Sequence, residues 1–385
     1  MLTNRKKLVI ITPEYSGNKL FDGGLSSFLD KFIFLINKKY EVHLITSSYQ
    51  NKTSYKKNII LHEVKLSFFL KLIKFINIKF LIYLIYYPAQ SLILNNFLKE
   101  KCPKFDLYFY TNFEYVSLFQ PKNIKSILRI SSFDYIWFKR GFLSRSVSKF
   151  YDKIVLTKTT QIWSTSNFIS KYIDKRFKKK IIQIPPFMNK SNKIKIPKSL
   201  KKFKKINFLL FIGTISKRKG IHLLPKLYSE IYKKNSDFKF IIIGRDTKNY
   251  GKSNFEKYFK NKNFSKNCIY FGVRKKNFFL PLIKYAKVVT VPSLIETSPQ
   301  ILQEILAYDG VPVCSKNTSM EELVQNDKDF LFNKNDKNDL VDKTFNLMSK
   351  KNKEIKKKIK SFKGSLFKSS RKKIILSSLN VLEIK

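Results

Sequence analysis

The sequence is poor in cysteine and histidine, with three of each in 385 residues. Cys102, Cys268 and Cys314 are scattered and odd in number, so no disulfide framework is indicated. The histidines are equally scattered, and no group of cysteines and histidines has the spacing of zinc ligands. We therefore expect neither a structural nor a catalytic zinc ion.

Acidic residues are also scarce: 27 Asp and Glu stand against 77 Lys and Arg, a net charge of +50. The abundance of Lys, Asn, Ile and Phe is typical of a genome rich in A and T, which accounts for part of this charge without any function. The remaining positive charge favours anionic surroundings, such as nucleotide phosphates or an acidic membrane leaflet. A basic nucleic-acid-binding protein stays an alternative. Because the sequence contains no recognisable nucleic-acid motif, we expect no nucleic-acid partner.

Two further patterns are missing. The loop after the first predicted strand has no G-x-G-x-x-G, which argues against a nicotinamide dinucleotide site. The segment Met1–Lys7 is polar rather than a signal peptide. The expected compartment is the cytoplasm, and peripheral attachment to the inner face of the plasma membrane stays open.

The stretch Leu66–Glu100 is almost entirely apolar or aromatic, but Lys71, Lys74 and Lys79 interrupt it. A membrane-spanning helix needs about 20 residues with few charges, so this stretch is not expected to span. One interpretation is a helix packed on a sheet with its lysines reaching outward. The other is an interfacial membrane helix with a basic face. The sequence leaves both open.

What the chain does contain is an alternation of β-branched strands and amphipathic helices, which predicts an α/β fold in two halves. We predict a first domain over residues 1–186, a linker over 187–205, a second domain over 206–365 and a basic terminal helix over 366–385. The expected strands of the first domain are Leu8–Thr12, Val42–Thr46, Leu107–Tyr110, Ile124–Ile130, Gln161–Ser164 and Lys180–Ile184, with a helix from about Leu25 to Asn37.

The rest of the chain is organised around Val288–Val313, which reads VVTVPSLIETSPQILQEILAYDGVPV. It predicts a buried strand, a loop, a helix to about Tyr308 and a second buried strand. Thr297 and Ser298 are favourable N-cap residues, Pro299 suits the first helical position, and Thr297 with Gln300 fits a capping box. The backbone from Ser298 to Ile301 then forms an anion site at a helix N-terminus.

Glu296 and Glu304 in this unit have the E-x7-E spacing of retaining glycosyltransferases with the GT-B fold, and the segment resembles glycosyltransferase family 4 (glycosyl transferases group 1). PSLIET, LQEILAYDGVPV and the later NDKDFLFNKNDKNDL agree in order with that family. GTISKRKG after the strand Asn207–Ile212 resembles the family's G-x-l-x-x-x-K-G loop.

The resemblance implies two Rossmann-like domains facing across a cleft, with the donor bound mainly by the second. Lys219 and the helix tip, from Ser298 and Gln300 to Ile301 and Leu302, would hold the donor diphosphate. Glu304 would hold the ribose and Glu296 would act near the sugar ring. Further predicted site residues are Gly213, Arg218, Gly272 and Val273 around the donor, and Gly23, Gly24, Ser132 and Asp134 in the cleft.

The expected activity is retaining transfer of a hexosyl-type sugar from a nucleotide-diphospho-sugar to a glycan or lipid-linked acceptor, in cell-surface polysaccharide biosynthesis. The resemblance implies no cofactor and no metal, since the nucleotide-sugar is a substrate. The family commonly has a cleft histidine where this chain has Ser131 and Ser132. A non-catalytic GT-B scaffold therefore stays a second alternative.

Overall fold

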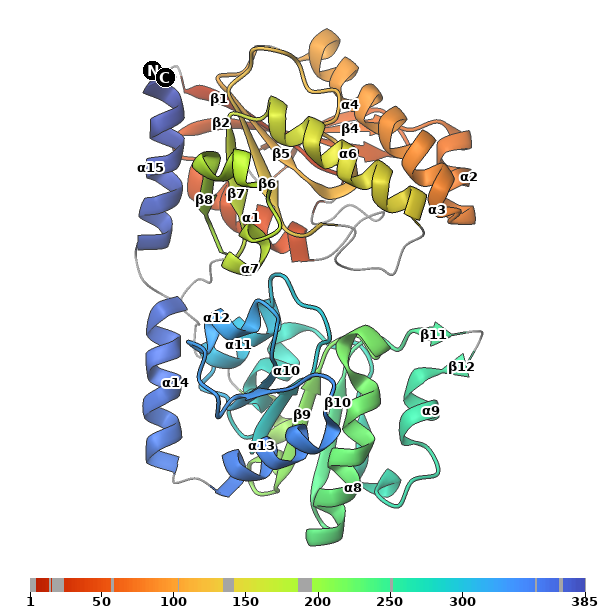
Figure 1. Ribbon diagram of the computed structural model, residues 1–385, viewed down its shortest axis with the longest axis vertical. Coiled ribbons are helices and arrows are strands. Elements are labelled where there is room, and N and C mark those ends of the chain that lie inside the picture. Colours follow the sequence, from red (N-terminus) through yellow and green to blue (C-terminus); the bar gives the residue numbers. More distant parts are fainter. Residues whose placement is uncertain are drawn as a thin grey trace. The chain divides into compact units, whose positions relative to one another are not determined.

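The computed structural model describes residues 5–13, 15, 24–56, 59–102, 104–133, 142–185, 196–249, 252–349, 352–366 and 370–384 (Figure 1). Its internal contacts divide the chain into two compact units. The first holds residues 1–187 together with 369–385, and the second holds residues 188–368. Each unit is built around its own, largely parallel sheet.

The first unit has an eight-stranded sheet in the order β3-β4-β2-β1-β5-β6-β7-β8. All neighbours are parallel except β3 and β4, which form an antiparallel pair at one edge. The buried runs of Val, Leu, Ile and Phe in the central strands are typical of a sheet covered on both faces. The strands are β1 (Lys6–Ile11), β2 (Tyr40–Ser48), β3 (Lys52–Lys56), β4 (Ile59–Lys65), β5 (Leu107–Thr111), β6 (Ser126–Ile130), β7 (Gln161–Ser164) and β8 (Ile181–Gln183).

Helices cover both faces of this sheet. One apolar core packs α1 and α15 against it, and another packs α4 and α6 against the opposite face. The main helices are α1 (Gly24–Ile36), α2 (Phe68–Ile76), α3 (Lys79–Leu81), α4 (Tyr87–Lys101), α6 (Phe142–Lys158), α7 (Asn167–Ser170) and α15 (Ser370–Ile384). The predicted terminal basic helix thus contributes Ile375, Leu379 and Leu382 to the core of the first unit.

The apolar stretch at 66–100 folds as α2, α3, a π-helical segment at Ile82–Tyr86 and α4. Within the part of the chain that the structure describes, no helix combines the length and the apolar character that crossing a membrane requires. Lys74 corrects the expectation that the lysines here point outward. Its Nζ lies 2.5 Å from a carboxylate oxygen of Glu114, which is buried. Charge pairing therefore draws this lysine inward.

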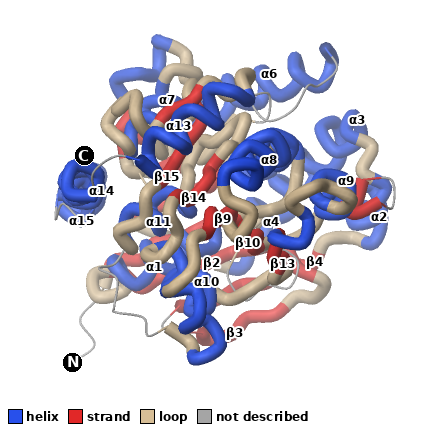
Figure 2. Tube along the Cα trace, turned by 90° about the horizontal axis from the view of Figure 1, so that it is seen from below, coloured by secondary structure: helices blue, strands red, loops and turns tan. Residues whose placement is uncertain are grey.

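The second unit has a six-stranded parallel sheet in the order β13-β10-β9-β14-β15-β16. Figure 2 shows β15, β14, β9, β10 and β13 side by side, with α8 and α13 on one face and α10 and α11 on the other. The strands are β9 (Phe208–Ile212), β10 (Lys239–Ile243), β13 (Cys268–Tyr270), β14 (Val288–Val291), β15 (Pro312–Ser315) and β16 (Leu331–Phe332), with a small β11 (Lys248–Asn249) and β12 (Lys252–Ser253) pair. The helices are α8 (Leu224–Lys234), α9 (Asn254–Phe259), α10 (Lys276–Ile283), α11 (Gln300–Ala307), α12 (Met320–Leu323), α13 (Lys337–Ser349) and α14 (Asn352–Leu366).

The described part of the predicted linker packs into the second unit. Residues Lys198–Lys204 form a 3₁₀ helix, and Leu200 and Phe203 are each only 1% exposed in the core of the second unit. The many lysines of this run suggested a solvated linker, but two apolar side chains three residues apart suffice to bury one side of a short 3₁₀ turn.

Candidate functional site

Three glycines end three adjacent strands at the carboxyl edge of the second sheet. The N–H of Gly213, after β9, donates to Ile243 O at 2.9 Å, and the N–H of Gly244 donates to Gly272 O at 2.9 Å. A Cβ on Gly244 would lie 1.9 Å from the carbonyl oxygen of Gly213. The strand ends therefore pack backbone against backbone, at the edge where open parallel sheets bind ligands.

The loop after β9 is held against the loop after β14. Gly220 has a φ of +75°, and a Cβ there would lie 1.8 Å from the carbonyl oxygen of Pro292. Two residues earlier, the carbonyl oxygen of Arg218 accepts a hydrogen bond of 2.9 Å from Leu294 N. Only glycine permits this approach, which explains why Lys219 is followed by glycine.

This contact brings the two predicted catalytic residues together. Nζ of Lys219 lies 2.5 Å from Oε2 of Glu296. The Lys219 side chain is 18% exposed and that of Glu296 is 8% exposed. The loop of Glu296 is anchored from the other side, because its carbonyl oxygen accepts from the N–H and the hydroxyl of Ser319 at 3.0 and 2.9 Å. Because the pair is mostly buried and its loops are anchored, the ammonium group of Lys219 is held in one position.

Helix α11 begins one residue later than predicted. Pro299 takes the cap position, with φ −76° and ψ 83°, and the helix starts at Gln300. The placement of Pro299 as the first helical residue is therefore wrong, since its ψ is not helical. The N–H of Gln300 donates to Ser298 O at 2.9 Å, so the following N–H groups of the first turn, on Ile301 and Leu302, complete the helix tip.

The predicted C-terminal stop of this helix is confirmed. Asp309 adopts a left-handed φ of 59°, and the N–H groups of Asp309 and Gly310 donate to Leu306 O and Ile305 O, the two bonds of a Schellman motif. A Cβ on Gly310 would lie 2.4 Å from a methyl carbon of Ile283, so the chain needs a glycine there. The motif turns the chain directly into β15.

Glu304 is buried on α11, with 8% of its side chain exposed, and it is not a solvated helix glutamate. Its Oε1 accepts a hydrogen bond from Nζ of Lys276, at the start of α10. Burial and the nearby Glu304 carboxylate both raise the pKa of Tyr308. The buried carboxylate is thus held in place by a lysine that is itself 54% exposed.

Lys276 is a site residue that the sequence did not reveal. It ends a basic run, Arg274–Lys276, directly after the predicted donor-site residues Gly272 and Val273. The place of this run in the sequence could have pointed to Lys276, but three basic residues do not stand out in a chain with 77 of them. Gly272 has open space around its Cβ position and a φ of +67°, and Val273 beside it is 63% exposed. These two residues leave the end of β13 accessible.

The first-unit predictions are described only in part. Gly24 is the first residue of α1, while Gly23 and Asp134 lie outside the described residues. Ser132 follows β6, and its carbonyl oxygen accepts a hydrogen bond from the side-chain amide of Asn112, after β5. The same side chain accepts from Ser131 N at 3.0 Å. Asn112 therefore fixes the turn that follows β6.

All three cysteines are free, and burial raises the pKa of the Cys102 thiol to about 11 and that of Cys268 to about 12. Among the described residues, no group of three or more His, Cys, Asp or Glu side chains is placed to hold a metal ion. This edge of the second sheet thus carries fixed cations, a helix N-terminus and two buried carboxylates.

Comparison with known proteins identifies a family over the second unit. Residues 192–362 match the family model of glycosyl transferases group 1, and they include every predicted site residue of the second unit. No curated protein sequence matches the chain.

Solved structures match over nearly the full length. One is an E. coli protein described as trehalose-6-phosphate bound with UDP-2-fluoro glucose, with a TM-score of 0.76, 11% identity and coverage of 98% of this chain and 99% of that one. A sucrose-phosphate synthase from Thermosynechococcus elongatus has a TM-score of 0.72, 14% identity and 98% coverage of both chains. A UDP-forming α,α-trehalose-phosphate synthase from Burkholderia xenovorans in complex with glucose-6-phosphate has a TM-score of 0.76, 10% identity and coverage of 98% and 100%. The predicted GT-B fold is confirmed, and the family match together with the fold supports a glycosyltransferase.

Proposed function

We propose that this chain is a retaining glycosyltransferase of the family 4 type. It moves a sugar from a nucleotide-diphospho-sugar to a glycan or lipid-linked acceptor, in the synthesis of a cell-surface polysaccharide. The observation that carries the proposal is the Lys219–Glu296 pair, which is mostly buried and stands at the carboxyl edge of the second sheet in the unit that also holds Glu304. The similarity of residues 192–362 to glycosyl transferases group 1 supports it.

Donor binding in this proposal uses fixed groups of the second unit. An ammonium group has three donors, so Lys219 can hold Glu296 and still donate to a diphosphate oxygen. The N-terminus of α11 adds backbone N–H groups and the positive end of a helix dipole. Glu304 accepts from the ribose hydroxyls, and the hydrogen bond from Lys276 keeps that carboxylate oriented. The strand end at Gly272 and Val273 gives the base room to lie against backbone.

Catalysis in this proposal is electrostatic and uses no metal. As the bond from the sugar to the diphosphate breaks, negative charge grows on the leaving oxygen, and Lys219 and the helix tip stabilise it. Glu296 stands near the sugar ring and orients it. We assign no protein nucleophile or general base, and the leaving phosphate takes the acceptor proton.

The acceptor side of the proposal includes peripheral contact with an anionic membrane. Apolar side chains in and around α2, α3 and the π-helical segment are 38–87% exposed: Phe68, Phe69, Leu72, Phe75, Ile76, Ile78, Phe80, Leu84 and Ile85. Contiguous exposed apolar residues mark a contact surface, and the high positive charge of the chain complements acidic lipids. This surface follows β4, at the carboxyl edge of the first sheet.

The membrane part can be tested with vesicles. We expect the chain to sediment with vesicles that contain an anionic lipid, and a Phe68→Ser/Phe75→Ser variant to lose most of that binding. Val381→Ser, which changes a 47% exposed residue on α15, is the matched control and should bind as the unchanged chain does. Equal binding by the double variant would refute membrane contact through this surface and leave the transfer reaction untouched.

The transfer reaction is tested by release of nucleoside diphosphate from a panel of UDP-, GDP-, ADP- and TDP-sugars with lipid-linked and oligosaccharide acceptors. We expect release from one nucleotide class, and a product whose anomeric configuration, measured by NMR, is that of the donor. Donor binding without turnover across the acceptor panel would instead support a non-catalytic scaffold. An inverted product would contradict the retaining assignment.

A further inference from the structure

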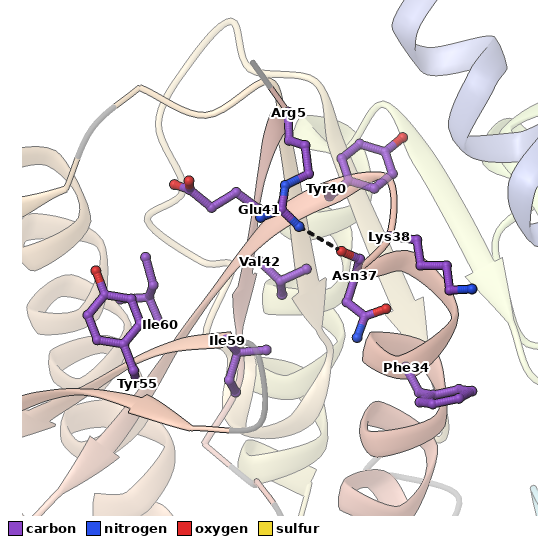
Figure 3. A pocket seen from close by; sticks show the side chains of 10 residues that line it. All are labelled: Arg5, Phe34, Asn37, Lys38, Tyr40, Glu41, Val42, Tyr55, Ile59 and Ile60. Atoms are coloured by element: carbon purple, nitrogen blue, oxygen red, sulfur yellow. Dashed lines mark hydrogen bonds between the residues drawn. The ribbon is translucent and has the colours of Figure 1, made fainter. Parts of the chain in front are cut away.

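The first unit contains a cavity of about 660 Å³ at the amino-terminal edge of its sheet, where β1, β2 and β4 begin (Figure 3). This edge is opposite the carboxyl ends of the strands, and none of the predicted site residues lines it. The cavity volume falls within the range of about 300–1,000 Å³ that is usual for small-molecule sites. The lining residues are Arg5, Phe34, Asn37, Lys38, Tyr40, Glu41, Val42, Tyr55, Ile59 and Ile60.

The cavity combines an apolar floor with aromatic sides. Val42 and Ile59 are 2% and 1% exposed, so they form a fixed apolar base. Phe34 near the end of α1 is 71% exposed, and Tyr55 on β3 is 85% exposed. Figure 3 shows these two rings on opposite sides of Ile59 and Val42. Single exposed aromatic residues are ordinary, but two that flank one apolar floor form a site for a ligand with flat apolar faces.

The rim is polar and carries a net positive charge. The Arg5 guanidinium donates to the carbonyl oxygen of Asn37 at 3.2 Å, which uses one of its five N–H donors and holds it at the opening. Lys38 adds a second, exposed cation. The one acid, Glu41, already has partners, because Oε1 lies 3.0 Å from Nε2 of His43 and 4.0 Å from Nζ of Lys7.

We propose that this cavity is a second saccharide site, which binds an anionic sugar unit of a glycan away from the place of transfer. The C–H bonds on the face of a sugar ring carry partial positive charge and pack well against the negative face of an aromatic ring, here Phe34 or Tyr55. The amide of Asn37 both donates to and accepts from sugar hydroxyls. Arg5 and Lys38 pair with the carboxylate or phosphate of the sugar unit.

The choice of a glycan as the source of this ligand rests on the proposed function. A transferase that extends a polymer binds that polymer more tightly when it has a second site for it. Linking two weak sites through one chain raises the apparent affinity without new contacts, provided the glycan can span them. The binding itself does not depend on catalysis, so it can be measured without any nucleotide-sugar.

The test is a calorimetric titration of the full chain, in low salt and without nucleotide, with a tetrasaccharide that contains glucuronic acid and with neutral maltotetraose. We expect the acidic tetrasaccharide to bind at least tenfold more tightly. Tyr55→Ala and Phe34→Ala should each weaken it about tenfold, and Arg5→Ala should remove the preference for the acidic ligand. Phe150→Ala, which truncates a 60% exposed ring on α6 of the same unit, should bind as the unchanged chain does.

The changed side chains are exposed, so the variants are expected to keep their unfolding temperature. Absence of binding by the unchanged chain, equal binding of both tetrasaccharides, or binding that is unaffected by Tyr55→Ala and Phe34→Ala would each overturn the proposal. The failure of the proposed transfer reaction would show separately, as absence of any stabilisation by nucleotide-sugars in a chain that still binds the acidic tetrasaccharide.

Discussion

Nζ of Lys219 lies 2.5 Å from Oε2 of Glu296, although 77 residues separate the two in sequence. The pair exists because Gly220 lets the loop after β9 touch the carbonyl of Pro292 in the loop after β14. Two strands that are neighbours in the sheet thus bring together a cation and an anion from distant segments. Because the two residues meet only when the second unit is folded, variants of this pair test the fold as well as the site.

Breaking this pair on one side should destabilise the second unit. Lys219→Met leaves the Glu296 carboxylate mostly buried and without its cation, which costs about 3 kcal/mol. Adding Glu296→Gln removes the unpaired charge and should restore most of the loss. Urea unfolding measures both variants. The exposed Lys226–Glu230 pair on α8 is the control, and Lys226→Met should cause no measurable change.

Gly220 and Gly364 should respond in opposite directions to alanine. At Gly220 a Cβ would overlap the carbonyl of Pro292 and the backbone has a left-handed φ, so Gly220→Ala should lower stability and weaken nucleotide-sugar binding. Gly364 is inside α14 with open space at its Cβ position. Gly364→Ala should raise stability by about 0.5–1 kcal/mol. Thermal unfolding that falls equally in both variants would contradict the loop contact.

A buried histidine pair predicts how stability changes with pH. His62 Nε2 lies 3.0 Å from His43 Nδ1, and Thr53 Oγ1 lies 3.1 Å from the other ring nitrogen of His62. Burial, and secondarily the charge of His43, lowers the pKa of His62 to about 4. Between about pH 6.5 and pH 4 the unfolded chain takes up a proton that the folded chain refuses. Stability is therefore lost as the pH falls through this window, by about 2–3 kcal/mol.

The variant His62→Gln removes this titration and keeps a side chain that can bond to Thr53. We expect its free energy of unfolding to depend less on pH between 4 and 6.5 than that of the unchanged chain. Urea unfolding at a series of pH values measures the difference. The same slope in both proteins would show that His62 does not titrate as its burial requires.

We expect replacement of Asn112 to impair use of the acceptor and to leave binding of the donor unchanged. Its side chain bonds to Ser131 N and Ser132 O, and so fixes the turn after β6. Because loss of two hydrogen bonds lets this turn move, we expect Asn112→Ala to lower kcat/KM for the acceptor about tenfold. Stabilisation by the nucleotide-sugar should stay unchanged. A loss of donor binding in this variant would assign the turn to the donor instead.

The sequence predicted well those features that local chemistry decides. The strand Gln161–Ser164 is confirmed at both ends, and the stop at Asp309-Gly310 is confirmed as a Schellman motif. Both depend on patterns within a few residues, namely two large apolar side chains in a short run and the Asp309-Gly310 pair at the helix end. The placement of Pro299 as the first helical residue was wrong by one position, because sequence patterns locate a helix end only to within one or two residues.

Features that depend on distant partners could not be read in this way. Lys276 reaches Glu304 over 28 residues, and Lys74 reaches Glu114 over 40 residues. In a chain with 77 basic residues, no local pattern separates these paired lysines from solvated ones. The burial of Leu200 and Phe203 was missed for the same reason, since the lysines around them suggested a solvated segment.

The most direct test of the central claim is thermal shift of the full chain with UDP-, GDP-, ADP- and TDP-sugars, repeated with Glu304→Ala. The matched control is Glu256→Ala, which changes a 60% exposed glutamate of the same unit. The account predicts stabilisation by one nucleotide class, retained by Glu256→Ala and lost by Glu304→Ala. Stabilisation that survives Glu304→Ala, or no stabilisation by any donor, would contradict a nucleotide-sugar site at this helix.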